Sequence, residues 1–507
     1  MNAIPSRPAG GNPVLREFTA SIVVFLVAMP LCMGIAVASG VPAEKGLVTG
    51  IIGGLVVGLL AGSPLQVSGP AAGLAVIVFE FIREHGLAAL GPVLVLAGAL
   101  QIAAGTARMG GLFRSISPAL VHGMLAGIGL LIVAGQFHVL FDAKPLPNGL
   151  ENLSAMPARL LGLSSELRAT EQALLLGLAT IGLMLAWEKW RPARLRLVPG
   201  ALLGVGGATL ASAGLGLDVA RVTVPDSLVG ALALPEAGFL SALADPALLA
   251  AALAIAFIAS AETLLSAAAV DGMHDGVRTD YDKELRAQGV GNLLCGLAGA
   301  LPMTGVIVRS SANVQAGART RLSAVLHGAW ILGLVVLMPG LLREVPMAAL
   351  GGVLVVTGWR LVSLSHVRHL FRHYGALPAV IWAATFTTVV AVDLLTGVLV
   401  GLALSALELV PHGKSLKLTV DETHDSERSL VRLDGAATFL SLTRILAALE
   451  RIPAGRPVHL DLRGLRGIDH TAAETMKQWL GRRRRAGAAI DLSGPPDLLG
   501  RLAPAGG

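Results

Sequence analysis

A helix is interrupted within the stretch Ser63-Pro-Leu-Gln-Val-Ser-Gly-Pro-Ala-Ala-Gly73, which leads directly into the apolar run Leu-Ala-Val-Ile-Val. The residues Leu65–Val67 favour an extended backbone. Pro70 stands where a helix would have its first turn, and Ser68 or Gly69 could cap that helix. The stretch therefore predicts an extended piece followed by a short helix.

A second stretch, Pro302-Met-Thr-Gly-Val-Ile-Val-Arg-Ser-Ser-Ala-Asn313, has the same design. Val306–Val308 is β-branched and favours an extended form. A helix could start at Arg309 or Ser310. Each of the two stretches is too short or too polar to span a bilayer alone.

The composition places both stretches in a membrane protein. Of the 507 residues, 54% are hydrophobic and only 14% are charged, whereas soluble proteins carry about 25% charged residues. The net charge of +6 is interpreted as loop charge that orients the spans, not as a sign of nucleic-acid binding. Cys32 and Cys295 lie in apolar stretches, so neither a disulfide nor a metal site is expected. The first apolar run continues into Met29-Pro30 without a signal-peptide cleavage site.

About 20 apolar residues are needed to cross a bilayer. Segments that qualify run over roughly 18–40, 44–62, 87–107, 119–140, 171–187, 198–216, 247–270, 286–301, 323–342, 346–360, 376–394 and 396–411. The two interrupted helices, near 70–83 and 309–318, bring the total to about fourteen. The fold class is therefore a polytopic α-helical membrane protein.

The interrupted helices hold the third place in each half of seven segments. Seven is odd, so the two halves have opposite orientations, and paired interrupted helices in an inverted repeat indicate a transport site. Their N-terminal N–H groups and dipoles would form an anion site near the midplane. The plainer alternative is that Gly and Pro mark ordinary loops. The predicted site comprises Ser68, Gly69, Ala71, Ala72, Val308, Arg309, Ser310 and Ser311.

Two charges lie inside apolar sequence. A charge at the break of a membrane segment is usually functional, although Arg309 could instead form a structural ion pair with Glu262 or Glu284. Glu262 must be either protonated or coordinated. It is a candidate site for a coupling proton or cation, with Ser266 one turn on. The alternative is a buried carboxylate satisfied by Ser, Thr or backbone N–H groups.

The charges of the loops are asymmetric, as the positive-inside rule requires if the N-terminus is cytoplasmic. Loops expected inside hold Arg108, Arg114, Lys189, Arg191, Arg194, Arg196, Arg368 and Arg372. The expected outer loop near 217–246 holds Asp218, Asp226, Glu236 and Asp245 against Arg221. An even number of spans returns the C-terminus to the cytoplasm, so we expect a multi-pass protein of the cell's inner membrane.

The composition changes after residue 412, where charges become frequent. Alternation in Ser415–Val420 and Ser429–Leu433 predicts strands, Pro457–Leu462 a buried strand and His470–Leu480 a helix. These elements predict a small soluble α/β domain. The expected domains are a cytoplasmic segment 1–17, a transport domain 18–412 with repeats at about 18–216 and 247–412, and a C-terminal domain 413–507.

Several motifs follow one another in the second half. They are Glu262-Thr-Leu-Leu-Ser-Ala-Ala-Ala-Val-Asp271, Asp282-Lys-Glu-Leu-Arg-Ala-Gln-Gly289, Gly291-Asn292, Pro302-Met-Thr-Gly305 and the run Arg309–Ser323. With Val67-Ser-Gly-Pro-Ala-Ala-Gly73, their order and spacing resemble the sulfate permease (SulP) family. The resemblance implies seven-plus-seven inverted repeats split into core and gate domains, a substrate site between the third and tenth segments, a C-terminal STAS domain and a homodimer. Family members carry sulfate, bicarbonate, chloride, other small anions or dicarboxylates.

The sequence departs from one branch of that family. The sodium-dependent bicarbonate carriers have an acidic residue matching Glu262 and a hydroxyl residue matching Ser266, but Thr at the position of Ile307 and Gly at that of Arg309. The lost Thr and the gained Arg favour a proton over sodium as the coupling ion.

The C-terminal run Val458–Ala472 resembles the STAS signature, whose usual Asp-Ser-Ser-Gly is here Asp469-His-Thr-Ala472. Thr471 stands where related signalling proteins carry a phosphorylated Ser. The plainer reading is a helix start capped by Asp469. Arg482–Arg485 is either a solvated helix face or a contact with anionic lipid.

The function expected from these features is secondary active transport of a small inorganic anion of the sulfate or bicarbonate class, by alternating access and in symport with a proton. Alternatives are a sodium-coupled bicarbonate or dicarboxylate (fumarate-like) symporter, a channel-like or exchanging anion conductor, and a sensor. Glu262 favours coupling, because uncoupled conduction needs no intramembrane carboxylate. The sequence has no Walker motif, nucleophile–base pair or metal cluster, so an enzyme and a cofactor are not expected.

Both termini are predicted to be cytoplasmic. Protease accessibility of N- and C-terminal tags in inside-out and right-side-out vesicles tests this, with digestion expected only in the inside-out preparation. A C-terminal tag that is cleaved in right-side-out vesicles would contradict the prediction of fourteen segments.

Overall fold

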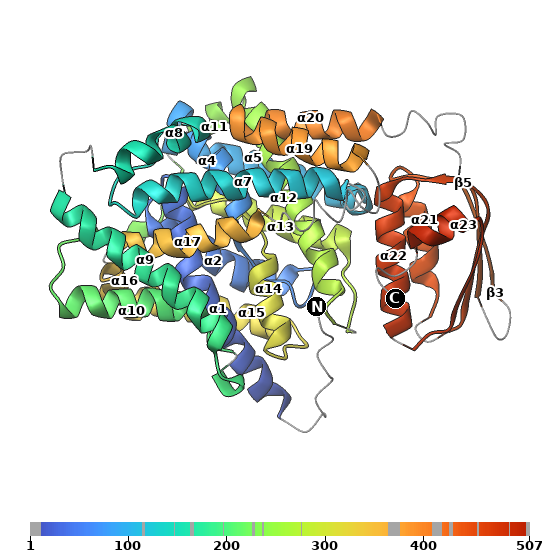
Figure 1. Ribbon diagram of the computed structural model, residues 1–507, viewed down its shortest axis with the longest axis horizontal. Coiled ribbons are helices and arrows are strands. Elements are labelled where there is room, and N and C mark those ends of the chain that lie inside the picture. Colours follow the sequence, from blue (N-terminus) through green and yellow to red (C-terminus); the bar gives the residue numbers. More distant parts are fainter. Residues whose placement is uncertain are drawn as a thin grey trace.

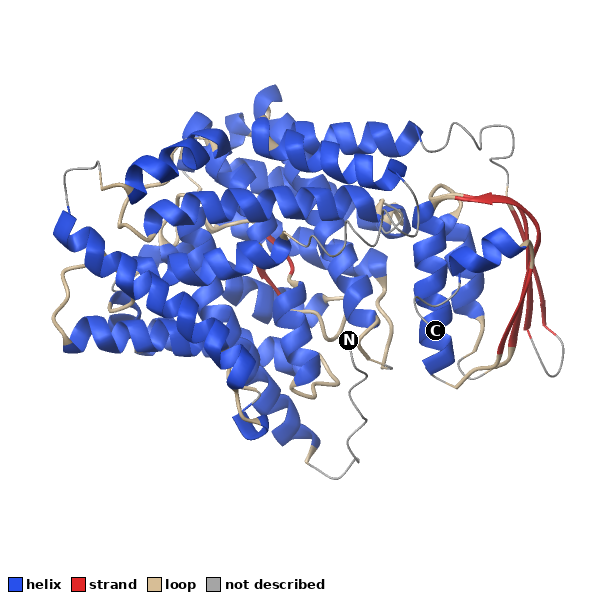
Figure 2. Ribbon diagram, in the orientation of Figure 1, coloured by secondary structure: helices blue, strands red, loops and turns tan. Residues whose placement is uncertain are grey.

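The computed structural model of the chain has a large helical unit and a smaller C-terminal domain that contains a sheet (Figure 1, Figure 2). The structure describes residues 12–113, 117–146, 148–162, 167–195, 197–225, 229–235, 238–274, 276–362, 376–407, 418–424, 429–453, 456–485 and 487–502. Arg114, Arg196, Asp226, Glu236, Arg368 and Arg372, named above for the loop charges, lie outside these ranges.

Each of the segments predicted from hydropathy falls on a helix, and the two halves of the chain correspond. The first half contains α1 (Pro13–Ala38), α2 (Ala43–Ile52) continued by η1 (Gly53–Val57) and α3 (Gly58–Leu60), α4 (Ala72–His85), α5 (Leu90–Thr106), α7 (Pro118–Val139), α9 (Leu167–Trp190) and α10 (Gly200–Gly214). The second contains α12 (Pro246–Asp271), α13 (Tyr281–Leu297), α14 (Ile307–Gln315), α15 (Leu322–Leu337), α17 (Met347–Leu361), α19 (Ala376–Ala391) and α20 (Leu394–Leu407).

Short helices lie in the connections, among them α6 (Gly110–Phe113), α8 (Gly149–Leu160), α11 (Phe239–Ala242) and α16 (Pro339–Arg343). Within the described residues, six helices are long and apolar enough to cross a membrane, and five shorter ones are also apolar. The interrupted helices α4 and α14 belong to neither group, and in each of them a short extended strand precedes the helix.

The helices form two packing units. The first four segments of each half pack together, with α13 against α5 and α1 against α2 and α15. The last three of each half form the second unit, in which α7 packs against α17 and α19, and α9 against α10 and α17. We call these the core unit and the gate unit. They meet where α4 contacts α7 and α1 contacts α17.

Glycine allows the closest contact within the core unit. A Cβ atom at Gly98 of α5 would lie 2.5 Å from the carbonyl oxygen of Gly289 in α13. A Cβ atom at Gly289 would lie 2.7 Å from the carbonyl oxygen of Gly98. Small residues at such crossings let two backbones approach closely in a membrane, where van der Waals contact rather than the hydrophobic effect holds helices together.

The C-terminal domain has a sheet of order β3-β4-β5-β6, with β3 and β4 antiparallel and the other pairs parallel. Its elements are β3 (Thr419–His424), β4 (Ser429–Ala437), α21 (Leu442–Arg451), β5 (Val458–Ile468), α22 (His470–Arg485), β6 (Ile490–Ser493) and α23 (Pro496–Leu502). The predicted strands at 429–433 and 457–462 and the helix from His470 are confirmed. The first predicted strand lies partly outside the described residues, and β3 begins at Thr419. Figure 1 shows α21 and α22 between the sheet and the helical unit.

The C-terminal domain contacts the segment between α5 and α7. The Ser117 hydroxyl, at the start of α7, lies 3.0 Å from His470 Nε2, and the Thr443 hydroxyl donates to the Gly111 carbonyl over 3.5 Å. The N–H of Gly110 donates to Asp282 at the start of α13, over 2.8 Å. The segment therefore touches the core unit, the gate unit and the C-terminal domain.

The α5–α13 crossing gives a stability prediction. Gly98→Val should lower the free energy of unfolding by about 1–3 kcal/mol, because the new methyl groups force the two backbones apart. Gly206→Val in α10 is the matched control, since a Cβ atom there meets nothing within 4 Å. Thermal unfolding of the detergent-solubilised protein measures both. Equal midpoints for the two variants would contradict the packing described here.

Candidate functional site

The two interrupted segments meet in a two-stranded ribbon at the centre of the core unit. Strands β1 (Ser68–Pro70) and β2 (Met303–Gly305) pair antiparallel, with Ser68 opposite Gly305 and Pro70 opposite Met303. Each strand is followed within two residues by its short helix. Because the strands are antiparallel, α4 and α14 leave the ribbon at opposite ends, with their N-termini beside it.

The sequence placed both helix starts incorrectly. Pro70 belongs to β1 rather than to a helix, and α4 begins at Ala72 with Ala71 as its N-cap. Helix α14 begins at Ile307, two residues before Arg309. The reason is the pairing between the two segments, which local propensity does not register. Neither helix has a side-chain cap, so its first N–H groups are left for a ligand or water.

The serine hydroxyl groups of the predicted site bond to neighbouring parts of the protein. Ser68 Oγ accepts a hydrogen bond from Gln288 Nε2 over 2.6 Å. Ser310 Oγ accepts from the Val67 N–H over 2.9 Å and donates to the Val306 carbonyl over 2.7 Å. Ser311 donates to the carbonyl of Val308 on its own helix. These three hydroxyl groups therefore each have a partner within the protein.

One face of α13 supports the ribbon, and the sequence analysis did not assign it a role. Glu284, Gln288 and Asn292 follow one another at intervals of four and are fully buried. Glu284 accepts from the Ser63 N–H over 2.9 Å. Asn292 pairs with both backbone groups of Met303, over 2.7 and 3.2 Å. The sequence signal that could have identified this face is the spacing of polar residues at every fourth position within a membrane helix.

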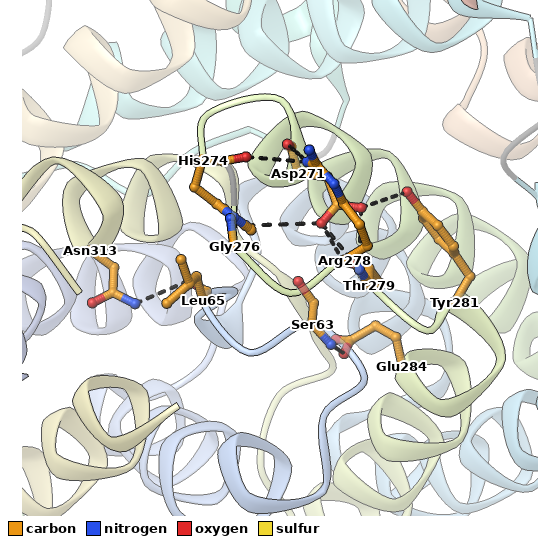
Figure 3. A network of polar contacts seen from close by, with 10 residues as sticks. All are labelled: Ser63, Leu65, Asp271, His274, Gly276, Arg278, Thr279, Tyr281, Glu284 and Asn313. Atoms are coloured by element: carbon orange, nitrogen blue, oxygen red, sulfur yellow. Dashed lines mark hydrogen bonds and ion pairs between the residues drawn. The ribbon is translucent and has the colours of Figure 1, made fainter. Parts of the chain in front are cut away.

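Further side chains hold the chain that leads into β1. Asn313 of α14 donates to the Leu65 carbonyl over 3.0 Å. Figure 3 shows these contacts beside the α12–α13 connection, which is closed around Asp271. Asp271 accepts from the hydroxyl groups of Thr279 and Tyr281 over 2.9 and 3.0 Å. The extended segment is thus held by α13 and α14, through Glu284 and Asn313.

Arg309 is fully buried, and its guanidinium group lies against β1. A Cβ atom at Gly69 would be 2.1 Å from Arg309 Nη1, so Gly69 makes room for this side chain. Nη2 donates to the Pro70 carbonyl over 3.3 Å. Nε and Nη1 have no hydrogen-bond partner within the described part of the chain. The ion pair with Glu262 or Glu284 considered from the sequence is not present among these residues.

Glu262 lies against the first turn of α4. A Cβ atom at Gly73 would be 2.7 Å from each carboxylate oxygen. Oε2 is buried and has no partner among the described residues. A carboxylate at a helix N-terminus is stabilised by about 0.3–1 kcal/mol at exposed sites. Ser266, one turn on in α12, is buried. The two candidate charges therefore lie near the two ends of one short junction, Gly69–Gly73.

The residues beside the helix N-termini leave a partly open, apolar surface. Ile307 and Val308 are each 40% exposed, and Ala72 is half-buried, whereas Ala71 is buried. The structure thus brings Arg309, Glu262 and two uncapped helix N-termini together, with aliphatic rather than polar side chains around them.

Comparison with known proteins shows that the sequence is similar to those of anion transporters. The model of the sulfate permease family matches residues 15–385. The chain is 30% identical over 451 residues to the putative sulfate transporter YvdB of Bacillus subtilis, covering 86% of this chain and 82% of the relative. It is 27% identical to the bicarbonate transporter BicA of Synechocystis, covering 77% of this chain and 69% of the relative.

Solved structures have the same fold. The transmembrane domain of a cyanobacterial bicarbonate transporter BicA matches with a TM-score of 0.66 at 24% identity, over 78% of this chain and 99% of that one. The overall structure of SLC26A9 matches with a TM-score of 0.68 at 15% identity, over 96% of this chain and 86% of that one. The second match extends the likeness into the C-terminal domain.

The position of Arg309 gives a binding prediction. Arg309→Ala should weaken anion affinity, because a charge-assisted interaction is worth roughly 1.5–3 kcal/mol, or about tenfold and more in affinity. Labelled sulfate and labelled bicarbonate, bound to the purified protein, measure it. Arg319→Ala removes the same charge from an exposed position and should leave affinity unchanged. A folded Arg309→Ala protein with normal affinity would make Arg309 purely structural.

Proposed function

This chain belongs to the sulfate permease family, and from that premise we propose that it carries a small inorganic anion of the sulfate or bicarbonate class across the cell membrane, by alternating access and in symport with a proton. It is a multi-pass membrane protein and a transporter rather than an enzyme. The observation that carries the proposal is the pair of uncapped helix N-termini beside the fully buried Arg309.

The anion is held by the first N–H groups of α4 and α14, at Ala72–Gly73 and Val308–Arg309. Such groups bind an anion without a full counter-charge, because the donors and the helix dipoles are already oriented. Arg309 adds a positive charge from behind the ribbon. Val308 and Ala72 contribute no polar side-chain atoms, so the site selects by charge and size more than by side-chain hydrogen bonds.

The proton is held by Glu262. Its carboxylate lies at the N-terminus of α4, which is also one of the proposed anion donors. An ionised Glu262 therefore competes with the anion for the same helix end and repels it electrostatically. Protonation removes the negative charge, so proton and anion binding favour one another. Movement of the core unit against the gate unit then exposes the neutralised site to the other side.

Three alternatives remain specific enough to test. Glu262 and Ser266 could ligate sodium in a bicarbonate or fumarate-like symporter, which the likeness to a bicarbonate transporter favours. A channel-like or exchanging conductor would use the same helix ends without coupling. Uptake of labelled sulfate, bicarbonate and fumarate into proteoliposomes, under a proton gradient and then a sodium gradient at fixed pH, separates these alternatives. Uptake of none of the three anions would contradict the proposed function.

We also propose that the C-terminal domain is a cytoplasmic STAS domain and that the protein forms a homodimer. The four-stranded sheet and its helices support the first, as does the structural likeness over 96% of the chain. Asp469 accepts from the N–H of Ala472 over 2.7 Å, which bears out the helix cap at the STAS signature. Thr471 is buried, and the lipid contact of Arg482–Arg485 stays a prediction.

Glu262→Gln mimics the protonated carboxyl group, so this variant should bind the anion at least as well as wild type. Its uptake should no longer depend on the proton gradient, because the group that carries the proton is lost. Initial uptake rates at several imposed gradients measure this. Glu171→Gln, at an exposed position of α9, is the control and should behave as wild type. A Glu262→Gln protein with a full proton response would contradict the proposed coupling.

A further inference from the structure

A small cavity lies along α4, away from the ribbon. It has a volume of about 50 Å³, and its walls include Ala75, Val76 and Glu80 of α4, Gln136 of α7 and Asn152 of α8. A cavity needs roughly 10–15 Å³ to hold one water molecule. This one can therefore hold water between the core unit and the gate unit.

The cavity opens on the side of the membrane opposite the C-terminal domain. Helix α7 begins beside Ser117, which contacts His470 of that domain. Gln136 follows eighteen residues after the first residue of α7, or roughly 27 Å along a helix that rises 1.5 Å per residue. Figure 1 also shows α8 in the half of the helical unit away from the C-terminal domain. With that domain in the cytoplasm, the cavity belongs to the outer half.

One buried side chain in the cavity wall, Gln136, has an unused hydrogen-bond acceptor. Gln136 is buried, and its Oε1 accepts no hydrogen bond from the described residues. Asn152, by contrast, is saturated: its side chain bonds both backbone groups of Leu146 and the Asn148 carbonyl. A buried acceptor without a donor calls for an O–H group. Water or a protonated Glu80 would supply one.

The charge around Glu80 favours a proton as the ligand. The charged groups that act electrostatically on it are Asp393, between α19 and α20, and Arg83 and Glu84 on α4 itself. Three carboxylates against one guanidinium group disfavour an anion. A metal ion would need more ligands, and no group of three or more His, Cys, Asp or Glu residues suited to a metal occurs in the described part.

The cavity leads from Glu80 toward Glu262. Its wall reaches inward along α4 to Ala75, two residues from Gly73, against which Glu262 lies. Gly73 and Glu80 are seven residues apart and share one face of α4, separated by roughly 10 Å along the axis. The cavity wall includes α4 residues between these two positions, from Ala75 to Glu80.

We propose that Glu80 is the outer proton acceptor of the transport cycle. Its carboxylate takes a proton from external water, and the resulting carboxylic acid donates a hydrogen bond to Gln136 Oε1. The proton then passes through water in the cavity to the carboxylate of Glu262, which leaves Glu80 ionised again. This inference rests on the proposed proton coupling and adds the residue at which the proton enters from the outer solution.

Infrared pH-difference spectra of the full-length protein in nanodiscs, without any anion, test whether Glu80 takes up a proton in this cavity. Wild type should show carboxylic acid absorption typical of apolar surroundings from two groups, of which one part is lost in Glu80→Gln and the other in Glu262→Gln. Both parts should remain in Glu84→Gln, whose carboxylate is exposed and paired with Arg83 over 3.7 Å. An absorption that persists unchanged in Glu80→Gln would overturn the proposal.

Uptake of labelled sulfate and of labelled bicarbonate into proteoliposomes tests the route. With an acidic outer solution, the uptake rate of Glu80→Gln should be lower than that of wild type by a factor of about ten or more. The reason is that a positioned proton donor commonly contributes a hundredfold or more to a rate. The affinity of Glu80→Gln for both anions should equal that of wild type. The Glu84→Gln control should take up both anions at the wild-type rate, and Glu80→Asp should recover part of the rate. If uptake by the wild-type protein does not depend on the proton gradient, both the proposed proton coupling and the proposed role of Glu80 are wrong. A Glu80→Gln protein with the full proton response would overturn the proposed role of Glu80 alone.

Discussion

The structure depends on satisfying the backbone of two extended segments inside a membrane. In hydrocarbon an unpaired N–H or C=O group is costly, so non-helical backbone is tolerated only where protein supplies partners. Here the β1–β2 ribbon supplies some of them. Side chains of Glu284, Asn292 and Asn313 supply others. Only because these groups are paired can the N–H groups at the starts of α4 and α14 remain uncommitted.

The same constraint explains the arrangement of the charges. Arg309 passes behind the ribbon because Gly69 has no side chain, and Glu262 reaches α4 because Gly73 has none. The two charges are thus held apart by the junction that connects β1 to α4, instead of neutralising each other. In a direct ion pair the two charges would neutralise each other, and Arg309 would attract an anion less strongly. Because the two charges are separated, each of them can interact with an anion that enters the site.

The sequence was most informative where structure is local and periodic. Hydropathy located the helices, and the Gly- and Pro-containing stretches located both interruptions, because these signals act within a few residues. The helix starts at Ala72 and Ile307 were missed, since the ribbon pairs residues more than two hundred positions apart. The partners of Ser68 and Ser310 could not be predicted for the same reason: Gln288 and the Val67 N–H come from other segments.

The segment that begins at Gly110 has a mechanical consequence. It is tied to the core unit through Asp282, continues into α7 of the gate unit, and carries the C-terminal domain on Gly111 and Ser117. A displacement of one unit against the other must therefore strain this segment or turn the domain attached to it. A small shift of the units within the bilayer would then rotate the C-terminal domain at the membrane surface.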